Sequence, residues 1–446
     1  MSLIARKRSF QLSFCYSVSR LLFTTSRAAA AFASSSSTPT TSNVLPVYFD
    51  STNDMHRDLQ YHPEQPARIT ACVSAIEKLM ERRQNESGGK CPMVQLIDVA
   101  PDSDRTSESS HHKQPFSDEE LQHARKILLK THEPYLVSKL EERCSSSRQR
   151  RIDEGKAPLG HMGYIDADTY LTTESFDVAL RATAAWIRAV NFVVDRDDDN
   201  ERVGKAAFAL TRPPGHHATY GTSNGFCIFN NAAAAAVHVL MNDPSKKVSI
   251  IDWDVHYGQG VADIVRRHEH ARYVSIHQVP AFPYMGEKLG IDGDFQNVLT
   301  IPVSPSTTWS KFLYRASSWY YSLSHFFLFV ACGFKECFEK ALKFVFDEDG
   351  WDPDVVIVCA GYDALDSDEL ANVSLQAKDY SAMTTMLWNR LSSSTSMNKK
   401  PAVVLGLEGG YQLSPMAGGG NLPDAVVKTI ESLIDSTSEA GDSRRL

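Results

Sequence analysis

The stretch Val248-Ser-Ile-Ile-Asp-Trp-Asp-Val-His256 joins a short apolar run to a cluster of acidic and imidazole side chains. The run Val248–Ile251 is apolar on both faces, which is typical of a strand buried in a parallel sheet. Asp252, Asp254 and His256 follow at a spacing of two residues. If the chain stays extended there, alternate side chains point to the same side. The stretch therefore predicts a buried strand that ends in a polar edge able to bind a metal ion.

Three further apolar runs are also followed at once by polar motifs. The runs are Ala206–Leu210, Val355–Cys359 and Ala402–Leu407. They lead into Arg212-Pro-Pro-Gly-His-His217, Gly361-Tyr-Asp363 and Glu408-Gly-Gly-Tyr411, respectively. Ligands of open α/β sheets bind beyond the carboxyl ends of the strands. We therefore expect the four motifs to meet at one edge of a sheet and to form one active site.

Helical patterns separate the apolar runs. Asn231–Met241 and Phe334–Phe346 are two examples. Strands that alternate with helices indicate an α/β fold with a parallel sheet. Three polar stretches are interpreted as surface loops: Asp102–Ser117, Arg143–Pro158 and Asp195–Arg202. The polar tail after Ile434 is expected to be frayed.

Asp254, His256 and Asp363 are the predicted metal ligands. Three protein ligands leave a position open for water, which distinguishes a catalytic zinc site from a closed structural one. Two carboxylates in the ligand set also suit Fe(II) or Mn(II), so the residues predict a metal more firmly than they predict which metal. Asp252 is an alternative ligand or a residue that orients a histidine.

His216 and His217 follow a rigid Pro-Pro-Gly turn, which places two imidazoles beyond the end of a buried strand. Imidazoles titrate near neutrality, so the pair suits proton transfer. Tyr411 follows Gly409-Gly410, which permits unusual backbone angles and close approach to a ligand. A phenol there can donate a hydrogen bond to a developing oxyanion.

Together these motifs resemble the zinc-dependent histone deacetylase family, in particular its class II and bacterial amidohydrolase branches. Further matching stretches are Gly225-Phe-Cys-Ile-Phe-Asn-Asn231 and His62-Pro-Glu64 with Arg68. The resemblance extends over about residues 45–435, with the motifs in the family's order. It implies an arginase-like α/β fold around a central parallel sheet of about eight strands.

The resemblance also implies a role for each site residue. Asp254, His256 and Asp363 would hold Zn²⁺, His216 and His217 would be the tandem histidines, with Asp252 directed at His216, and Tyr411 would polarise the acetyl carbonyl. The residues implied in substrate binding are Gly225, Phe226, Phe282, Leu370 and Asp168. A potassium ion would lie near Asp252, Asp254, His256 and Ser275.

Two features depart from the family pattern. Gln259 stands where the family usually carries Asp or Asn near the second histidine, and a neutral amide cannot hold an imidazolium as a carboxylate would. The stretch between Pro302 and Trp351 is also longer than in the family. Its aromatic part, residues 314–332, is either an exposed interaction patch or retained intron sequence.

The sequence therefore predicts a zinc-dependent hydrolase that converts N-acetyl-lysine in histone or other proteins to lysine and acetate. One alternative is a small-molecule amidohydrolase acting on acetylated polyamines. Leu370 stands at the position of a gate in the channel, where an apolar residue favours acetyl-lysine, although Asp368 and Glu369 are close by. The other alternative is an inactive scaffold that only binds partners, against which the complete set of motif residues argues.

The 446 residues carry a net charge of −8, which argues against direct nucleic-acid binding. No apolar run is long enough to span a bilayer. The eight cysteines contain no CxxC pair and are interpreted as buried, reduced thiols. These features favour a protein whose partner is an acetylated protein or peptide; the oligomeric state is left open.

The N-terminal residues form a segment of their own. Five basic residues and no acidic one precede Asp50, and Ser, Thr and Ala fill much of Arg27–Asn43. This composition favours a transit peptide to a mitochondrion or a plastid. The alternative is a disordered tail on a cytoplasmic or nuclear protein. We thus predict a leader at residues 1–44, a catalytic domain at 45–435 and a polar tail at 436–446.

Overall fold

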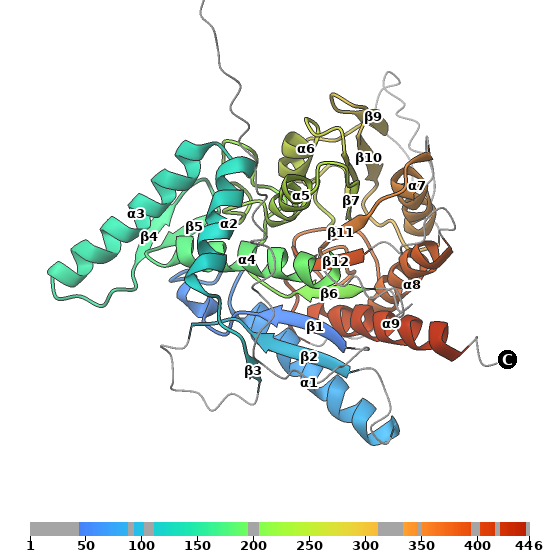
Figure 1. Cartoon of the computed structure of the whole chain (residues 1–446), viewed down its shortest axis with the longest axis horizontal. Helices are drawn as coiled ribbons and strands as arrows, with labels where there is room; N and C mark the ends of the chain where they lie inside the picture. Colours follow the sequence, from blue (N-terminus) through green and yellow to red (C-terminus); the bar gives the residue numbers. More distant parts are fainter. Residues whose placement is uncertain are drawn as a thin grey trace, which may run out of the picture. The chain divides into compact units, whose positions relative to one another are not determined.

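The fold is built around a central sheet of mostly parallel strands. The computed structural model describes residues 44–87, 93–101, 111–194, 205–310, 333–346, 350–393, 402–414 and 420–442. Within these residues ten strands form one sheet in the order β3-β2-β1-β6-β12-β11-β7-β8-β10-β9 (Figure 1). Every neighbouring pair is parallel except β9 with β10. The predicted α/β fold with a central parallel sheet is thereby confirmed.

Two short strands extend the predicted set of about eight strands to ten. The strands of this sheet are β1 Val44–Phe49, β2 Met93–Asp98, β3 His112–Lys113, β6 Ala206–Ala209, β7 Val248–Asp252, β8 Ala271–Gln278, β9 Gly290–Asp292, β10 Val298–Val303, β11 Val355–Ala360 and β12 Ala402–Leu407. The short strands β3 and β9 form its two edges. A separate antiparallel pair is made by β4 His161–Tyr164 and β5 Tyr170–Thr172.

Helices cover both faces of the sheet (Figure 1). They are η1 Asn53–Met55, α1 Ala67–Ser87, α2 Asp118–Thr131, α3 Pro134–Asp153, α4 Ser175–Val194, α5 Asn231–Asn242, α6 Gln259–Val265, α7 Phe334–Phe346, α8 Ala377–Ser393 and α9 Leu422–Asp442. One apolar cluster joins the sheet to α1, α7, α8 and α9, and a second joins it to α4, α5 and α6. A third cluster packs α2 and α3 against α4 and α5.

Strand β11 shows why such runs are apolar on both faces. Val356, Val358 and Ala360 pack with the first cluster, whereas Val355, Ile357 and Cys359 pack with the second. Alternate side chains of a strand point to opposite faces, so a strand covered by helices on both sides has no solvent-facing position.

The four strands predicted to deliver the motifs are neighbours in the middle of the sheet. Their order is β6-β12-β11-β7, and all run parallel. The segments that follow them therefore leave the sheet at the same edge. This arrangement turns four motifs that are distant in sequence into one constellation.

Two predictions from polar composition were wrong. Most of the expected loop Arg143–Pro158 is the second half of helix α3, which continues to Asp153. The expected frayed tail after Ile434 continues helix α9 to Asp442. The second half of α3 buries only one side, so its exposed residues are polar and obscure the helical period.

Other predictions fall partly outside the described residues. Residues 1–43, the expected loop 195–202 and the aromatic stretch 314–332 are among those outside. Five cysteines that are described, Cys72, Cys144, Cys227, Cys337 and Cys359, are buried, as expected for them. In the described part of the chain no helix is long and apolar enough to cross a membrane.

Candidate metal and active site

Three buried side chains converge at the edge of the sheet where β7 and β11 end. Asp254 and His256 follow β7, and Asp363 follows β11. One ligand atom from each lies within 4.8 Å of the others. Nδ1 of His256 is 3.0 Å from Asp363 Oδ2 and 3.3 Å from Asp254 Oδ1. The three residues predicted as metal ligands therefore lie together.

The path of the chain through this motif differs from the extended one that we expected. Strand β7 ends at Asp252, and Asp254 and His256 lie in the following loop. The backbone N–H of His256 donates to Asp254 Oδ1 at 2.9 Å, which turns the chain locally. Asp252 consequently does not join the three ligands, and it contacts His216 instead.

The charges of the triad suit a divalent cation. Burial alone would raise the pKa of Asp254, but the neighbouring His216 and His256 lower it, so this carboxylate stays ionised. Burial and the Asp254 charge both raise the pKa of Asp363, because two buried carboxylates repel each other. A cation bound between them would relieve that repulsion. Carboxylate oxygen and imidazole nitrogen are suitable ligands for zinc.

Two glycines allow the backbone to approach the triad. A Cβ atom at Gly361 would lie 2.0 Å from Asp254 Oδ2, and one at Gly409 would lie 2.2 Å from Asp363 Oδ2. Neither position can carry a larger residue without moving a ligand. The backbone N–H of Gly409 in turn donates to Asp254 Oδ2 at 2.8 Å. These contacts explain the local sequences Gly361-Tyr-Asp363 and Glu408-Gly-Gly-Tyr411.

The tandem histidines lie beside the triad and have different partners. Nδ1 of His216 is 3.1 Å from Asp252 Oδ2, and Nε2 is 3.7 Å from Asp254 Oδ1. Nδ1 of His217 is 2.7 Å from the amide oxygen of Gln259. One imidazole thus faces carboxylates and the other a neutral amide.

These partners separate the protonation states of the two histidines. Burial would lower the pKa of His216, but Asp254 and Asp252 outweigh it and raise the pKa to about 10. Burial and the charge of His216 lower the pKa of His217 well below its usual range. The carboxylates around His216 therefore favour its protonated form, whereas burial and the charge of His216 favour the neutral form of His217.

Tyr411 is held from both sides of its backbone. Its N–H donates to Asp368 Oδ2 at 2.7 Å, and Arg68 donates to the carbonyl of Gly410 at 2.7 Å. The Arg68 guanidinium also lies 4.7 Å from the centre of the Tyr411 ring. Burial raises the pKa of the phenol well above its usual range, so Tyr411 remains an O–H donor.

Two aromatic rings, Phe282 and Phe226, pack against His217 and Tyr411, respectively. Phe282 packs edge-on against His217 with ring centres 4.9 Å apart, and Phe226 packs edge-on against Tyr411 at 5.7 Å. Both rings are partly exposed. Gly225 has φ +54°, and a Cβ there would lie 2.7 Å from the Phe282 ring. Only glycine therefore fits between Phe282 and the histidine.

Asp168 lies near Phe226, on the segment that precedes β5. Its carbonyl is 3.0 Å from His62 Nε2, and the His62 ring packs edge-on against Phe226. Burial and the neighbouring Asp166 raise the pKa of Asp168 to about 6. Asp166 accepts hydrogen bonds from the backbone N–H groups of Asp168 and Gly225, so it connects the two predicted substrate-binding residues.

Leu370 has two acidic neighbours in the sequence, Asp368 and Glu369, and only Asp368 is buried. Leu370 is partly buried, and its N–H donates to Asp368 Oδ1 at 3.0 Å. Asp368 is buried and also accepts from Tyr411, so it supports the backbone. Glu369 is exposed and accepts a hydrogen bond from Tyr61 at 2.7 Å. Of the two acidic neighbours, only Glu369 therefore faces solvent.

Ser275 lies next to Asp252 in the sheet, because β7 and β8 pair these two residues. Its Oγ is 2.9 Å from Nδ1 of His277. Asp252 also accepts a hydrogen bond from Tyr273 at 2.8 Å. The four residues predicted near a potassium ion thus come from the end of β7, the loop that follows it and the middle of β8.

Glu408 is a residue whose role the sequence did not indicate. It is fully buried, and its Oε2 accepts from the backbone N–H groups of Gly215 at 2.6 Å and His216 at 3.1 Å. Burial raises the pKa of Glu408 to about 7. Its position directly between the β12 run and Gly409 was the available signal: an acidic residue at the end of a buried strand needs a partner.

A buried ion pair joins the N-terminal motif to the histidine loop. Arg212 donates to Glu64 Oε1 at 2.7 Å and to Oε2 at 2.5 Å, and also to Tyr170 at 2.6 Å. Both charged groups are fully buried. Removal of one partner would leave an unpaired buried charge, which costs about 3–5 kcal/mol.

Comparisons with known proteins agree with this geometry. Residues 62–421 match the histone deacetylase domain. An uncharacterised protein of Synechocystis sp. is 32% identical over 374 residues, covering 84% of this chain and 94% of that protein. "Histone deacetylase 10, chloroplastic" of Oryza sativa subsp. japonica is 28% identical over 365 residues, covering 81% of this chain and 69% of that protein.

A solved structure shares the fold. The acetylpolyamine aminohydrolase of Burkholderia pseudomallei superimposes with a TM-score of 0.59 at 18% identity, over 87% of this chain and 98% of that chain. At this identity the similarity extends to the fold alone.

Proposed function

Since this chain belongs to the histone deacetylase family, we propose that it hydrolyses N-acetyl-lysine amides in proteins to free lysine and acetate. The observation that carries the proposal is the buried group Asp254, His256 and Asp363 beside a neutral imidazole and a protonated phenol. Amide hydrolysis needs an activated water, a base and an oxyanion donor. The site offers residues for each requirement.

Asp254, His256 and Asp363 would hold a zinc ion. Bound zinc supplies a Lewis acid that activates water and polarises a carbonyl. His217 takes the proton from the attacking water, because burial favours its neutral imidazole and Gln259 engages its other ring nitrogen. The same imidazole then delivers this proton to the leaving amine. Tyr411 donates its O–H to the oxyanion.

The remaining predicted residues would bind and orient the substrate. Phe226 and Phe282 would wall the channel for the acetyl-lysine stem, and the carbonyl of Gly225 would accept the amide N–H. Asp168 would bind the substrate at the mouth, and Leu370 would form its rim. A potassium ion near Asp252, Asp254, His256 and Ser275 would add positive charge beneath the histidines.

An acetylpolyamine hydrolase is the second candidate, because a protein with that name shares the fold. A polyamine substrate carries a second ammonium, which favours an acidic gate. Leu370 is apolar, Asp368 is buried beneath the backbone, and Glu369 is engaged by Tyr61. These contacts favour the protein substrate.

Turnover measured on a panel of substrates, with zinc content determined on the same preparation, tests the proposal. We expect acetyl-lysine peptides to be cleaved with a higher kcat/KM than acetylputrescine or acetylspermidine. The reverse order would favour the polyamine enzyme. One equivalent of zinc without turnover of any acylated amine would favour an inactive binding scaffold.

We also propose import of the protein into an organelle, on the basis of the basic, acid-free residues 1–49. A rice relative carries "chloroplastic" in its name, which supports a plastid over a mitochondrion. Fusion of residues 1–49 to a fluorescent reporter and sequencing of the mature N-terminus test this. A cytosolic or nuclear location of the reporter, together with an intact N-terminus of the native protein, would contradict import. Histones would then be the favoured substrates.

A further inference from the structure

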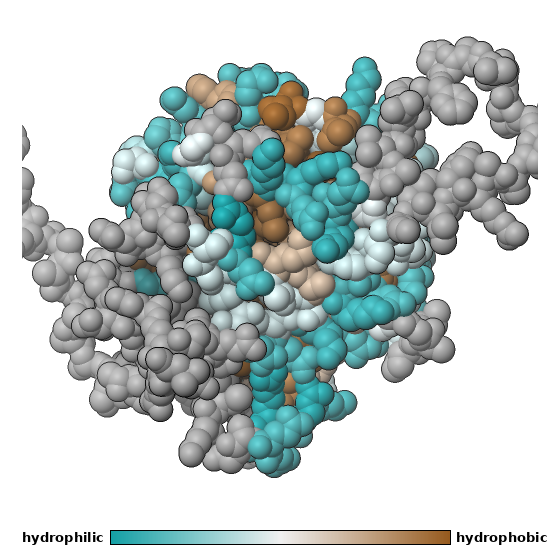
Figure 2. All heavy atoms as spheres, turned by 90° about the vertical axis from the view of Figure 1, so that its right-hand side faces the viewer, coloured by the Kyte–Doolittle hydropathy of each residue, from teal (hydrophilic) through white to brown (hydrophobic). Residues whose placement is uncertain are grey.

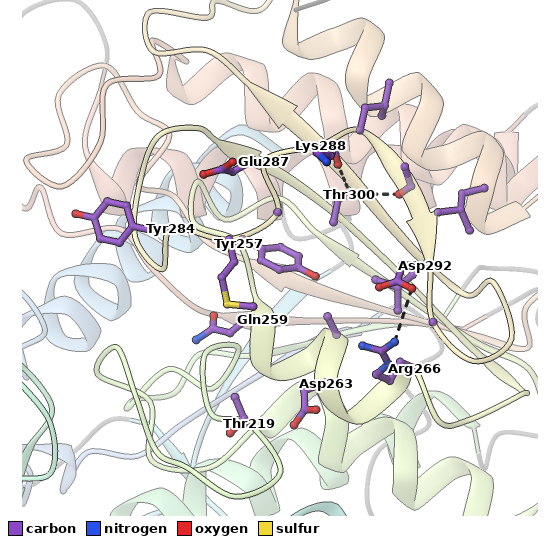
Figure 3. Close-up of a pocket in the computed structure, with 18 residues that line it drawn as sticks. Thr219, Tyr257, Gln259, Asp263, Arg266, Tyr284, Glu287, Lys288, Asp292 and Thr300 are labelled. Carbon is purple, nitrogen blue, oxygen red and sulfur yellow. Dashed lines mark hydrogen bonds and ion pairs between the residues drawn. The ribbon is translucent and has the colours of Figure 1, made fainter. Parts of the chain in front are cut away.

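A pocket of ≈1060 Å³ lies beside the site, between helix α6 and the loop that continues into β9 (Figure 3). Residues of α6 and of the segments directly before and after it form one wall, among them Tyr257, Gln259 and Arg266. Residues 284–293 form the other wall. The pocket contains none of the three metal-binding residues, so it is separate from the metal site itself.

Both walls of this pocket are connected to the active site. Gln259, on the first wall, is hydrogen-bonded to His217. The second wall begins two residues after Phe282, which packs against the same histidine. The carbonyl of Gly286 lies 2.9 Å from His277 Nε2, which fixes the loop to strand β8. The pocket therefore adjoins the channel wall.

The loop presents apolar side chains to solvent. Tyr284 is 75% exposed, Met285 54%, Leu289 52% and Ile291 46%. Figure 2 shows exposed hydrophobic side chains near the top of one face, the end at which Figure 1 draws β9. Contiguous exposed apolar side chains typically mark a binding surface.

The charged groups are spread around the pocket: Arg266 and Asp292 lie at one end, and Glu287 lies nearer Tyr284 (Figure 3). Arg266 is 3.7 Å from Asp292 and 3.5 Å from Asp294, so its charge is already paired. The end of the pocket nearest Phe282 carries the exposed apolar side chains of Tyr284 and Met285, which suit an apolar group.

We propose that this end of the pocket binds an apolar or aromatic side chain of the protein substrate, within two residues of the acetyl-lysine. The inference rests on the proposed deacetylase function and adds a determinant of sequence preference. An extended peptide advances about 3.3 Å per residue. The two residues from Phe282 to Tyr284 span at most about 7 Å, so a neighbouring substrate side chain can reach Tyr284 while acetyl-lysine passes Phe282.

The test uses the full chain and a set of acetyl-lysine peptides. Alanine, leucine, phenylalanine or lysine is placed in turn at each of the two positions on either side of the acetyl-lysine. We expect leucine or phenylalanine at one position to raise kcat/KM at least about 10-fold over alanine, the usual effect of filling an apolar pocket. The double variant Tyr284→Ala/Leu289→Ala should lose this preference.

Two controls separate the pocket from the catalytic chemistry. Tyr135→Ala removes an equally exposed aromatic residue from helix α3 and should keep the preference. Acetyl-lysine blocked at both ends, which has no neighbouring side chain, should be cleaved equally by the double variant and the unaltered protein. That equality shows that the double variant is folded and active.

The possible outcomes are distinct. If blocked acetyl-lysine is cleaved but no position shows a preference, the pocket proposal is wrong and the proposed function stands. A preference for lysine over leucine and phenylalanine, or one that survives in the double variant, would also overturn it. If the unaltered protein cleaves no acetyl-lysine compound, the proposed function fails and this inference fails with it.

Discussion

His256 supplies the one nitrogen ligand of the triad, so its replacement tests the metal site directly. We expect His256→Ala to abolish turnover and to lower the zinc content, because only two of the three predicted ligands, Asp254 and Asp363, would remain. Elemental analysis of the purified variant is the measurement. Full zinc occupancy in this variant would remove His256 from the ligand set.

Substitution of Tyr411 should lower kcat without changing the zinc content. Its side chain is not among the three ligands, and its backbone is held by Asp368 through a hydrogen bond that phenylalanine preserves. We expect Tyr411→Phe to retain zinc and to lower kcat by about 10²- to 10³-fold, the usual effect of losing one oxyanion donor. An unchanged kcat would exclude Tyr411 from the mechanism.

Glu408 connects two elements, the end of strand β12 and the loop that carries the tandem histidines. Its carboxylate accepts two backbone N–H groups of that loop. Loss of a buried acceptor costs about 1–3 kcal/mol per group left unsatisfied. We therefore expect Glu408→Ala to lower kcat by about 10-fold or more and to leave KM and zinc content unchanged.

Glu408→Gln is the matched variant for this prediction. The pKa of Glu408 is raised to about 7, and glutamine has the shape of its protonated form. The amide oxygen can accept the same two hydrogen bonds, so this variant should recover most of kcat. If the alanine variant is as active as the unaltered protein, Glu408 does not position the histidines.

Helix α3 illustrates how an element can escape detection in the sequence. Its second half is rich in Ser, Arg and Gln, which are typical of loops as well as of exposed helix faces. Only Val137, Leu140 and Cys144 are buried, and they lie three and four residues apart. This narrow stripe becomes evident once the partner helices α2 and α4 are known.

At the scale of the whole molecule, four buried histidines contribute a part of the free energy of unfolding that is lost in acid. Burial lowers the pKa of His56 to about 3 and the pKa values of His132, His238 and His277 to about 4. The unfolded chain takes up protons near its ordinary pKa of about 6.5, whereas the folded chain does not. This stabilisation is thus fully present above pH 6.5 and is lost as pH falls toward 4.

Thermal unfolding at pH 7.5 and pH 5 measures this effect. We expect His238→Asn to raise the Tm at pH 5 relative to the Tm at pH 7.5, compared with the same difference in the unaltered protein, because this histidine can then no longer take up a proton on unfolding. His112→Asn, which changes an exposed histidine, serves as the control. The same pH dependence of Tm in His238→Asn and in the unaltered protein would contradict the prediction.

The sequence by itself determined the α/β fold and the residues of the motifs. Runs such as Val248–Ile251 and Ala402–Leu407 are apolar on both faces, which only a covered parallel strand requires. The polar residues that follow each run could be assigned to one edge of the sheet, because the carboxyl ends of parallel strands meet there. Helix Phe334–Phe346 was also predicted with its observed bounds.

The contacts that these polar residues make with one another depend on the tertiary structure. Asp252, two residues before a ligand, turns to His216, as the family resemblance implied. The physical reason is seen only in the fold: β7 ends there and the chain bends. Asp368 turns inward because the N–H of Tyr411 needs an acceptor. Glu408 and the pocket beside Phe282 depend on contacts between segments far apart in the chain. A sequence gives local preferences, whereas the partner that satisfies a buried polar group is set by the packing of the whole chain.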